Sequence, residues 1–265
     1  MQNKPKVGIY GLTGCAGDQL TILNCEDELL SICEALDIKC FPMAMTGCDE
    51  KCPLDIVFVE GSVVQPEEEE MLKKLRERAK LLIAIGTCAV WGGVQAMKNE
   101  IPREELKRKI YGPEGKIFKI NIAQPLSSFV RVDLAIPGCP IEKEQLLQGL
   151  ASLLHGDLPR LPTYAVCTEC KMAEYPCLLV EKGQLCLGPI TVAGCKARCP
   201  GYGQPGIGCR GPVEEANVAS EVNVLKEKGF TWVDIQNRLR TFAATAEPLK
   251  IESIKGAADA PIDSH

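Results

Sequence analysis

The stretch KVGIYGLTGCAGDQL, residues 6–20, decides the fold of this chain. A short apolar run that begins at Val7 ends in a turn of small residues at Gly11, and Cys15 and Asp18 follow before a helix-like segment. A strand that stops at glycines and leads into a helix places its turn residues at the carboxyl end of the strand. In open α/β sheets, that edge is where ligands bind.

Three later apolar runs end in the same way. DIVFVEG brings Glu60 to its end, KLLIAIGTC brings Cys88, and VDLAIPGC brings Cys139. If these strands are parallel neighbours, the polar residues at their four ends, including Cys15 and Asp18, meet at one place. Three thiolates and a carboxylate at one place make a metal site, and soft thiolate ligands favour an iron–sulfur cluster.

The bulk composition excludes several classes of protein. With 265 residues and 46% hydrophobic residues, the chain can bury a sizeable core in one large domain or two smaller ones. A net charge of −5 and a pI near 5.3 argue against a nucleic-acid partner. No apolar run reaches the roughly 18 residues of a membrane span. The N-terminus shows no charged-then-apolar leader, so we expect a cytoplasmic protein.

The first half alternates short β-branched runs with helix-period segments, which predicts βαβ units and a parallel sheet. After the first strand, one helical face is expected to carry Leu20, Leu23, Leu29, Leu30 and Ile32. A second strand is predicted over 37–45. Pro66 suits the first turn of a helix, and the acidic run 67–70 reads as solvated capping charge at the positive end of its dipole.

The second half changes character after a proline-containing linker at 158–162. Seven cysteines lie between residues 167 and 209, with glycines and prolines among them and little apolar matter for a core. Inorganic clusters would supply the cross-links that packing cannot. Two helices are predicted over 214–230 and 231–243, and the last twenty or so residues look loose.

Fifteen cysteines in a long α/β chain without an export signal favour metal ligation over a disulfide framework. The chain contains two histidines, which argues against a histidine-rich zinc or copper site and against a Ser-His-Asp triad. The first four cysteines of the later run, spaced C-x2-C-x6-C-x8-C, are enough for one [4Fe–4S] cluster, and the next three are spaced C-x3-C-x9-C. Structural zinc is the alternative for the first four, although they lack the paired CxxC knuckles typical of zinc.

At these motifs the chain resembles the small, electron-transferring subunit of [NiFe] hydrogenases. The resemblance rests on LTGCAGDQL, VEGSV, GTCAVWGG, PGCP, CLGPITVAGC and GCRGP, which follow one another in the family's order between residues 6 and 212. Within the family, the chain is most similar to the cytoplasmic type, the sulfhydrogenase delta and the methyl-viologen- or F420-reducing hydrogenase gamma subunits. The N-terminal half alone also resembles the 20-kDa cluster subunit of complex I, which lacks the C-terminal cysteine run.

The resemblance implies a flavodoxin-like parallel-sheet domain over residues 1–157 and an irregular iron–sulfur domain with two terminal helices over 158–265. It implies an electron relay through three clusters, between the nickel–iron site of a separate large subunit and further flavin or iron–sulfur subunits, with no catalysis by this chain alone. The expected cofactors are two to three [4Fe–4S] clusters, one site being open to a [3Fe–4S] cluster. The alternatives are a relay subunit of a reductase that has lost hydrogen chemistry and a zinc-stabilised scaffold without redox activity.

The family's motifs assign the cluster ligands by position. The proximal set is Cys15, Asp18, Cys88 and Cys139. The distal set is Cys167, Cys170, Cys177 and Cys186. The medial set is Cys195, Cys199 and Cys209.

Two positions depart from the family pattern. Asp18 stands where a cysteine is usual, as it does in the F420-reducing branch, and is either the fourth ligand or a hydrogen-bonding neighbour of a three-cysteine cluster. Gly206 stands where the nearest relatives have a cysteine. The medial set can therefore hold a [3Fe–4S] cluster, a [4Fe–4S] cluster with a non-cysteine ligand, or no cluster.

Glu60 has two interpretations: a capping or salt-bridged carboxylate near the large-subunit interface, and a proton-relay or cluster-tuning group. The other cysteines are assigned no cluster. Cys25, Cys33 and Cys40 are predicted to be buried free thiols. The residues between Cys48 and Cys52 are predicted to form a plain loop, with a redox pair or an extra ligand pair as alternatives.

Overall fold

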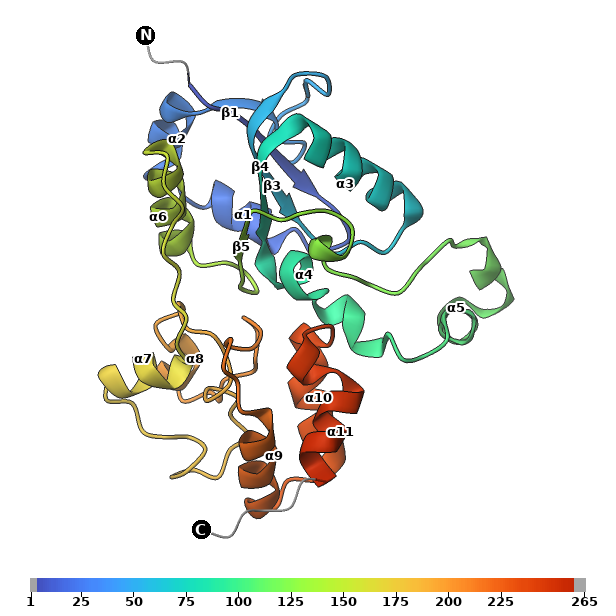
Figure 1. Ribbon diagram of the computed structural model, residues 1–265, viewed down its shortest axis with the longest axis vertical. Coiled ribbons are helices and arrows are strands. Elements are labelled where there is room, and N and C mark those ends of the chain that lie inside the picture. The colour runs from blue at the N-terminus through green and yellow to red at the C-terminus, as the bar shows by residue number, and fades with distance from the viewer. Residues whose placement is uncertain (1–3, 260–265) are drawn as a thin grey trace. The chain divides into compact units, whose positions relative to one another are not determined.

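The computed structural model describes residues 4–259 (Figure 1). The chain divides into two compact units, residues 1–160 and residues 161–265. Strands and helices alternate in the first unit, whereas the second consists of helices joined by irregular segments. Among residues 4–259, no helix has both the length and the apolar character needed to cross a membrane.

A five-stranded parallel sheet forms the centre of the first unit. Its strands are β1 (Lys6–Gly11), β2 (Asp37–Cys40), β3 (Leu54–Glu60), β4 (Ala79–Ile85) and β5 (Leu134–Ile136). Their order is β2-β1-β3-β4-β5, which is the flavodoxin-like doubly wound order and confirms the predicted fold class. The strand order reverses between β1 and β3, whose paired ends are Gly11 and Glu60. Ligands bind at such switch points, outside the carboxyl ends of the strands.

Helices cover both faces of the sheet, which explains the near-continuous apolar sequences of its central strands. On one side lie α1 (Gly17–Leu23), α2 (Leu29–Ala35) and α6 (Lys143–Leu154), and on the other lies α3 (Pro66–Arg78) (Figure 1). The core between the sheet and α3 includes Tyr10, Val57, Leu72 and Leu82.

Helix α3 begins as predicted, with Pro66 in its first turn and a capping box between Gln65 and Glu68. The Glu68 carboxylate accepts hydrogen bonds from the backbone N–H groups of Gln65 (2.9 Å) and Val64 (2.8 Å). It also accepts one from the hydroxyl of Thr13 (2.7 Å). The capping role is confirmed for Glu68, and the same side chain fastens the start of α3 to the turn that follows β1.

Three local predictions are wrong. The expected helix after β1 is interrupted, so that Leu20 and Leu30 are 47% and 77% exposed and share no buried face. The second strand ends at Cys40. Part of the tail predicted to be loose forms α11 (Ile251–Asp259), which packs on α9 (Val218–Glu227). Residues 260–265, also predicted to be loose, lie outside the described part of the chain.

One pair of cysteines forms a disulfide. Cys40, at the end of the edge strand β2, is bonded to Cys48 in the loop before β3, with an S–S distance of 2.07 Å. The prediction of a free Cys40 is therefore wrong. Cys25 is a buried free thiol as predicted, whereas Cys33 is free but exposed, and Cys52 is free.

The segment between β4 and β5 begins with α4 (Gly86–Trp91) and contains short helical pieces. They are η1 (Val94–Lys98), α5 (Arg103–Tyr111), η2 (Gly112–Ile117) and η3 (Leu126–Ser128). The second unit contains α7 (Val166–Met172), α8 (Arg198–Gly201), α9 (Val218–Glu227), α10 (Trp232–Ala243), η4 (Glu247–Leu249) and α11. The two predicted terminal helices are α9 and α10, each capped at its N-terminus by a side chain, Asn217 and Thr231 respectively.

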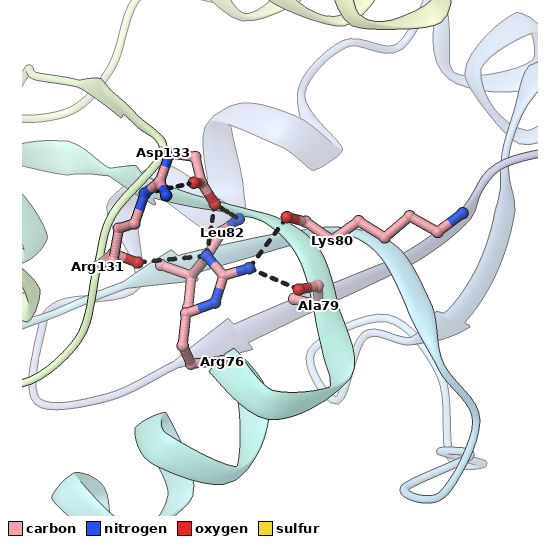
Figure 2. A network of polar contacts seen from close by, with 6 residues as sticks. All are labelled: Arg76, Ala79, Lys80, Leu82, Arg131 and Asp133. Carbon is pink, nitrogen blue, oxygen red and sulfur yellow. Dashed lines mark hydrogen bonds and ion pairs between the residues drawn. The ribbon is translucent and has the colours of Figure 1, made fainter.

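A polar network at the opposite edge of the sheet fixes the register of β4 and β5. Figure 2 shows Arg76, Ala79, Lys80, Leu82, Arg131 and Asp133. The carboxylate of Asp133 accepts hydrogen bonds from the N–H of Leu82 (2.8 Å) and from the guanidinium of Arg76, which also donates to the carbonyl of Lys80. Burial alone would raise the pKa of Asp133, but these donors hold it below its ordinary value.

We expect Asp133→Ala to lower the free energy of unfolding by about 2 kcal/mol at pH 7, because Arg76 and the N–H of Leu82 lose a charged acceptor. Since folding lowers the pKa of Asp133, its contribution is present above the unfolded value of about 3.9 and is lost as the pH falls through the folded value. Urea unfolding from pH 7 to pH 3 measures this difference. Arg131→Ala is the matched control, because Arg131 is 86% exposed and 3.3 Å from Asp133; an equal loss in both variants would contradict the assignment.

Candidate metal centres

The proximal set comes from the carboxyl ends of three strands of one sheet. Cys15 and Asp18 follow β1, Cys88 lies in α4 directly after β4, and Cys139 follows β5. The non-glycine residue Ala16, with φ of 61°, turns the chain between Cys15 and Asp18.

Hydrogen bonds tie these segments to one another. The N–H of Thr87 donates to the carbonyl of Gly138 (2.7 Å), and the N–H of Gly138 donates to the Thr87 hydroxyl (3.2 Å). The N–H of Ile141 donates to Asp18 Oδ1 at 2.7 Å. The ends of β4 and β5 are thereby joined, and the turn after β1 is fastened to the loop after β5.

Glycines allow the donor side chains to approach closely. A Cβ atom at Gly86 would lie 1.7 Å from Asp18 Oδ2, and one at Gly93 would lie 2.4 Å from Cys88 Sγ. Both glycines have positive φ, 82° and 64°. Side chains at these two positions would occupy the space of the Asp18 carboxylate and the Cys88 sulfur, so the site requires glycine at both positions.

Burial dominates the electrostatics of the proximal set, and the charges of neighbouring groups add to its effect. Burial raises the pKa of Cys88 to about 12, and Cys139, Asp18 and Cys15 act in the same direction. Burial, with the charges of Asp18 and Cys15, raises the pKa of Cys139 to about 11. Burial and the charge of Glu60 also raise the pKa of Asp18 to about 7, against the hydrogen bond from Ile141.

The donor set fits an iron–sulfur cluster. Thiolates are the soft ligands that iron–sulfur clusters require, and several anionic groups in a partly buried site do not readily ionise together without a compensating positive charge. The iron ions of a cluster would provide that charge. The fit is chemical and steric: Cys88 lies within electrostatic range of the other two thiols and the carboxylate, and glycines leave room beside Asp18 and Cys88.

Glu60 is 2% exposed and belongs to the surroundings of this set. Its carboxylate accepts a hydrogen bond from Gln19 Nε2 (2.8 Å), and its charge raises the pKa values of Asp18 and Cys139, which burial raises most. Helix capping is not its role in the structure: Ala16 precedes α1 and Gln65 caps α3.

Two glutamines in this region had no sequence signal. Gln19 orients Glu60, and Gln95 accepts a hydrogen bond from the Cys88 thiol (3.4 Å) while donating to the carbonyl of Thr13 (3.2 Å). A single polar residue follows no periodicity and matches no spacing rule. Its role becomes visible only when the fold shows what it faces.

The distal set is assembled within the second unit. Cys167 and Cys170 lie on α7, and Cys177 and Cys186 lie on the irregular segment that follows. Burial raises the pKa of Cys167 to about 12, and the charges of the other three cysteines act in the same direction. The structure thus brings the four predicted ligands within electrostatic range of one another.

Cys186 receives hydrogen bonds from two glycine N–H groups, Gly188 and Gly206, the latter at 3.1 Å. A Cβ at position 206 would lie 3.2 Å from the Gly188 nitrogen and 3.4 Å from Cys186 Sγ. Position 206, at which the sequence is expected to depart from the family pattern, therefore borders the distal set in this structure. Hydrogen bonds to sulfur are one of the factors that set the potential of a cluster.

The medial set lies on a short stretch of the second unit. Cys199 is in α8, Cys195 precedes that helix, and Cys209 follows Gly208, which has φ of 80°. Burial raises the pKa of Cys195, the charge of Glu169 raises it further, and the N–H groups of Arg198 and Ala197 act in the opposite direction.

Among residues 4–259, no three or more histidine, cysteine, aspartate or glutamate side chains are grouped as a single metal ion requires. A four-iron cluster binds each of its cysteines through a different iron atom, so its ligands need not be grouped around one point.

Comparison with known proteins places the chain among redox subunits. Residues 15–153 match the family model described as NADH ubiquinone oxidoreductase, 20 Kd subunit. Sulfhydrogenase 2 subunit delta of Pyrococcus furiosus is 41% identical over 238 residues, covering 90% of this chain and 99% of the relative. One subunit of the vhu F420-non-reducing hydrogenase of Methanocaldococcus jannaschii is 32% identical, covering 88% of this chain and 92% of the relative. A chain in the crystal structure of an NAD+-reducing [NiFe]-hydrogenase is 28% identical with a TM-score of 0.55, over 60% of this chain and 96% of that one.

We expect Gly93→Ala to lower the iron content by about one cluster, about four iron atoms per chain. The added Cβ would collide with Cys88 Sγ, and the change would show in iron analysis of the anaerobically purified protein. Gly112→Ala is the matched control, because Gly112 has φ of 66° but no atom within 4 Å of an added Cβ. Equal iron contents in the two variants would show that the clearance around Cys88 does not matter.

Proposed function

Because the chain belongs to the NADH:ubiquinone oxidoreductase 20 kDa subunit family and, within it, to the small subunits of hydrogenases, we propose that it is the electron-relay subunit of a [NiFe] hydrogenase complex. The observation that carries the proposal is the proximal set: three thiols and a carboxylate from separate segments of one sheet edge, with glycines at the positions where side chains would obstruct them.

In this proposal Cys15, Cys88 and Cys139 hold a cluster at the end of the sheet. When bound, an iron–sulfur cluster supplies reversible one-electron transfer. The protein holds the thiolates in place, limits water around Cys88 by burial, and places the oxygen of the Gln95 side chain beside its sulfur. These contacts are the means by which the chain would set the potential of the site.

We propose that Asp18 is the fourth proximal ligand. The N–H of Ile141 fixes one carboxylate oxygen, and Gly86 leaves room for the other. The side chain is 5% exposed, and its charge acts on both Cys88 and Cys139. An ionised carboxylate in this position requires a positive partner, and iron would supply it.

The second unit would carry two further sites. The distal set has four cysteines and suits a [4Fe–4S] cluster. The medial set has three, for which we propose a [3Fe–4S] cluster. The expected cofactors are thus two [4Fe–4S] clusters and one [3Fe–4S] cluster.

The partners follow from the relatives and from the exposure of the proximal set. Cys15 and Cys139 are exposed, so the site opens at the surface of the first unit. We propose that a nickel–iron large subunit covers this edge, and that flavin or iron–sulfur subunits exchange electrons with the rest of the chain. The relatives named as hydrogenase subunits support a complex of this kind, and we propose that it is cytoplasmic.

Replacing a proximal ligand should separate hydrogen activation from electron relay. We expect Cys88→Ser in the purified complex to lower hydrogen-dependent reduction of a viologen dye by at least about 100-fold. Exchange of deuterium between gas and water should persist, because splitting hydrogen at a nickel–iron site needs no electron to leave it. Gas-phase mass spectrometry and dye absorbance measure the two activities.

Cys33→Ser is the matched control, since Cys33 is an exposed free thiol on α2, and it should leave both activities unchanged. A complex without nickel or exchange activity in its wild-type form would favour a relay subunit of another reductase. A wild-type chain that contains zinc and no iron would overturn the relay itself.

Asp18→Cys tests the ligand assignment. We expect the proximal cluster to be retained with a changed electron paramagnetic resonance (EPR) spectrum and midpoint potential, because a thiolate replaces a harder carboxylate ligand. An unchanged spectrum and potential would show that Asp18 is a neighbour of the cluster and not a ligand.

A further inference from the structure

Glu169 occupies an unusual position between two cysteines of the distal set. It lies on α7 in the sequence Cys167-Thr-Glu169-Cys170, but its carboxylate contacts the segment that carries Cys195. Oε1 accepts a hydrogen bond from the N–H of Gly194 at 2.8 Å, and Oε2 accepts one from the N–H of Ala197 at 3.1 Å. The Cys195 thiol lies 4.0 Å from Oε2. One side chain therefore joins the helix of the distal set to the loop of the medial set.

The loop that Glu169 holds has a strained backbone. Lys196 and Ala197 are consecutive non-glycine residues in the left-handed region, with φ of 54° and 49°. Ala197 is fully buried. Such conformations persist only where the surroundings impose them, and they gather at functional sites. The two N–H groups that bracket Cys195 both point at one carboxylate, so Glu169 supplies a specific reason for the loop to keep this shape.

The loop conformation in turn presents Cys195. The N–H groups of Arg198 and Ala197, the latter shared with Glu169, lie close enough to its sulfur to act against the effect of burial on the pKa of the thiol. The buried Arg210 acts in the same direction and donates from Nε to the carbonyl of Ala193 at 3.0 Å. Glu169 is the negatively charged group near this sulfur, and its effect opposes that of Arg210. Cys195 is therefore within electrostatic range of one negatively charged and one positively charged side chain.

Resting on the electron-relay function proposed above, we propose that Glu169 is a positioning residue that couples the two cluster sites of the second unit. From the helix that carries Cys167 and Cys170, it holds the Cys195 loop in its ligand-binding conformation. Its negative charge lowers the reduction potential of the medial cluster, because an added electron is repelled by a nearby carboxylate.

The test uses the full chain in its anaerobically purified complex, with EPR-monitored redox titration and iron analysis. Glu169→Gln keeps the shape of the side chain and one acceptor oxygen but removes the charge. We expect the midpoint potential of the medial cluster to move to a more positive value and that of the proximal cluster to stay unchanged. Glu169→Ala removes both hydrogen bonds, and we expect loss of the medial signal with the distal signal retained.

Glu174→Gln is the matched control, because Glu174 is an exposed carboxylate shortly after the same helix, and it should change neither potential. A medial signal with wild-type potential in Glu169→Gln, or a retained medial signal in Glu169→Ala, would overturn the proposal. Loss of all clusters in both variants would overturn it too, since the effect is confined to the Cys195 site. A wild-type complex without iron–sulfur signals would refute the relay function, whereas wild-type signals that the variants leave unmoved would refute this inference alone.

Discussion

Burial of several ionisable groups of like charge at the carboxyl edge of the sheet is the constraint on which the rest of the first unit depends. Three thiols and two carboxylates share this edge, and burial with mutual repulsion raises the pKa values of Cys88, Cys139 and Asp18. A fold that only needed stability would gain by replacing these groups with apolar ones. Their concentration at the switch point of a doubly wound sheet is understandable if a positively charged group joins them there.

The two units solve the problem of holding thiols in different ways. In the first, parallel strands bring distant cysteines to one edge, and glycines at 86 and 93 provide the clearance. In the second, short helices and turns hold the sulfurs, and backbone N–H groups of Gly188 and Gly206 are directed at Cys186. The first design relies on a buried apolar core behind the site, whereas the second has little core around its cysteines and would gain cross-links from bound clusters.

Much of this arrangement follows from patterns that the sequence displays openly. Apolar runs that end in glycine and a polar residue predict strand ends, and parallel strands must bring those ends to the same edge. The break between α1 and α2 was not predicted, because the spacing of the leucines from Leu20 to Leu30 is compatible with one continuous helix. The interruption changes the faces on which Leu20 and Leu30 lie. The Cys40–Cys48 bond could not be deduced because cysteine spacing does not define pairing. Gln19, Gln95 and Glu169 were missed because each acts through a contact distant in sequence.

The most direct test of the central claim is an anomalous-scattering map at the iron edge, from crystals of the anaerobically purified complex. Our account predicts a compact group of iron peaks bounded by Cys15, Asp18, Cys88 and Cys139, and further groups at the distal and medial sets. A map with no iron at the end of the sheet, or with a single zinc ion in place of a cluster, would contradict it.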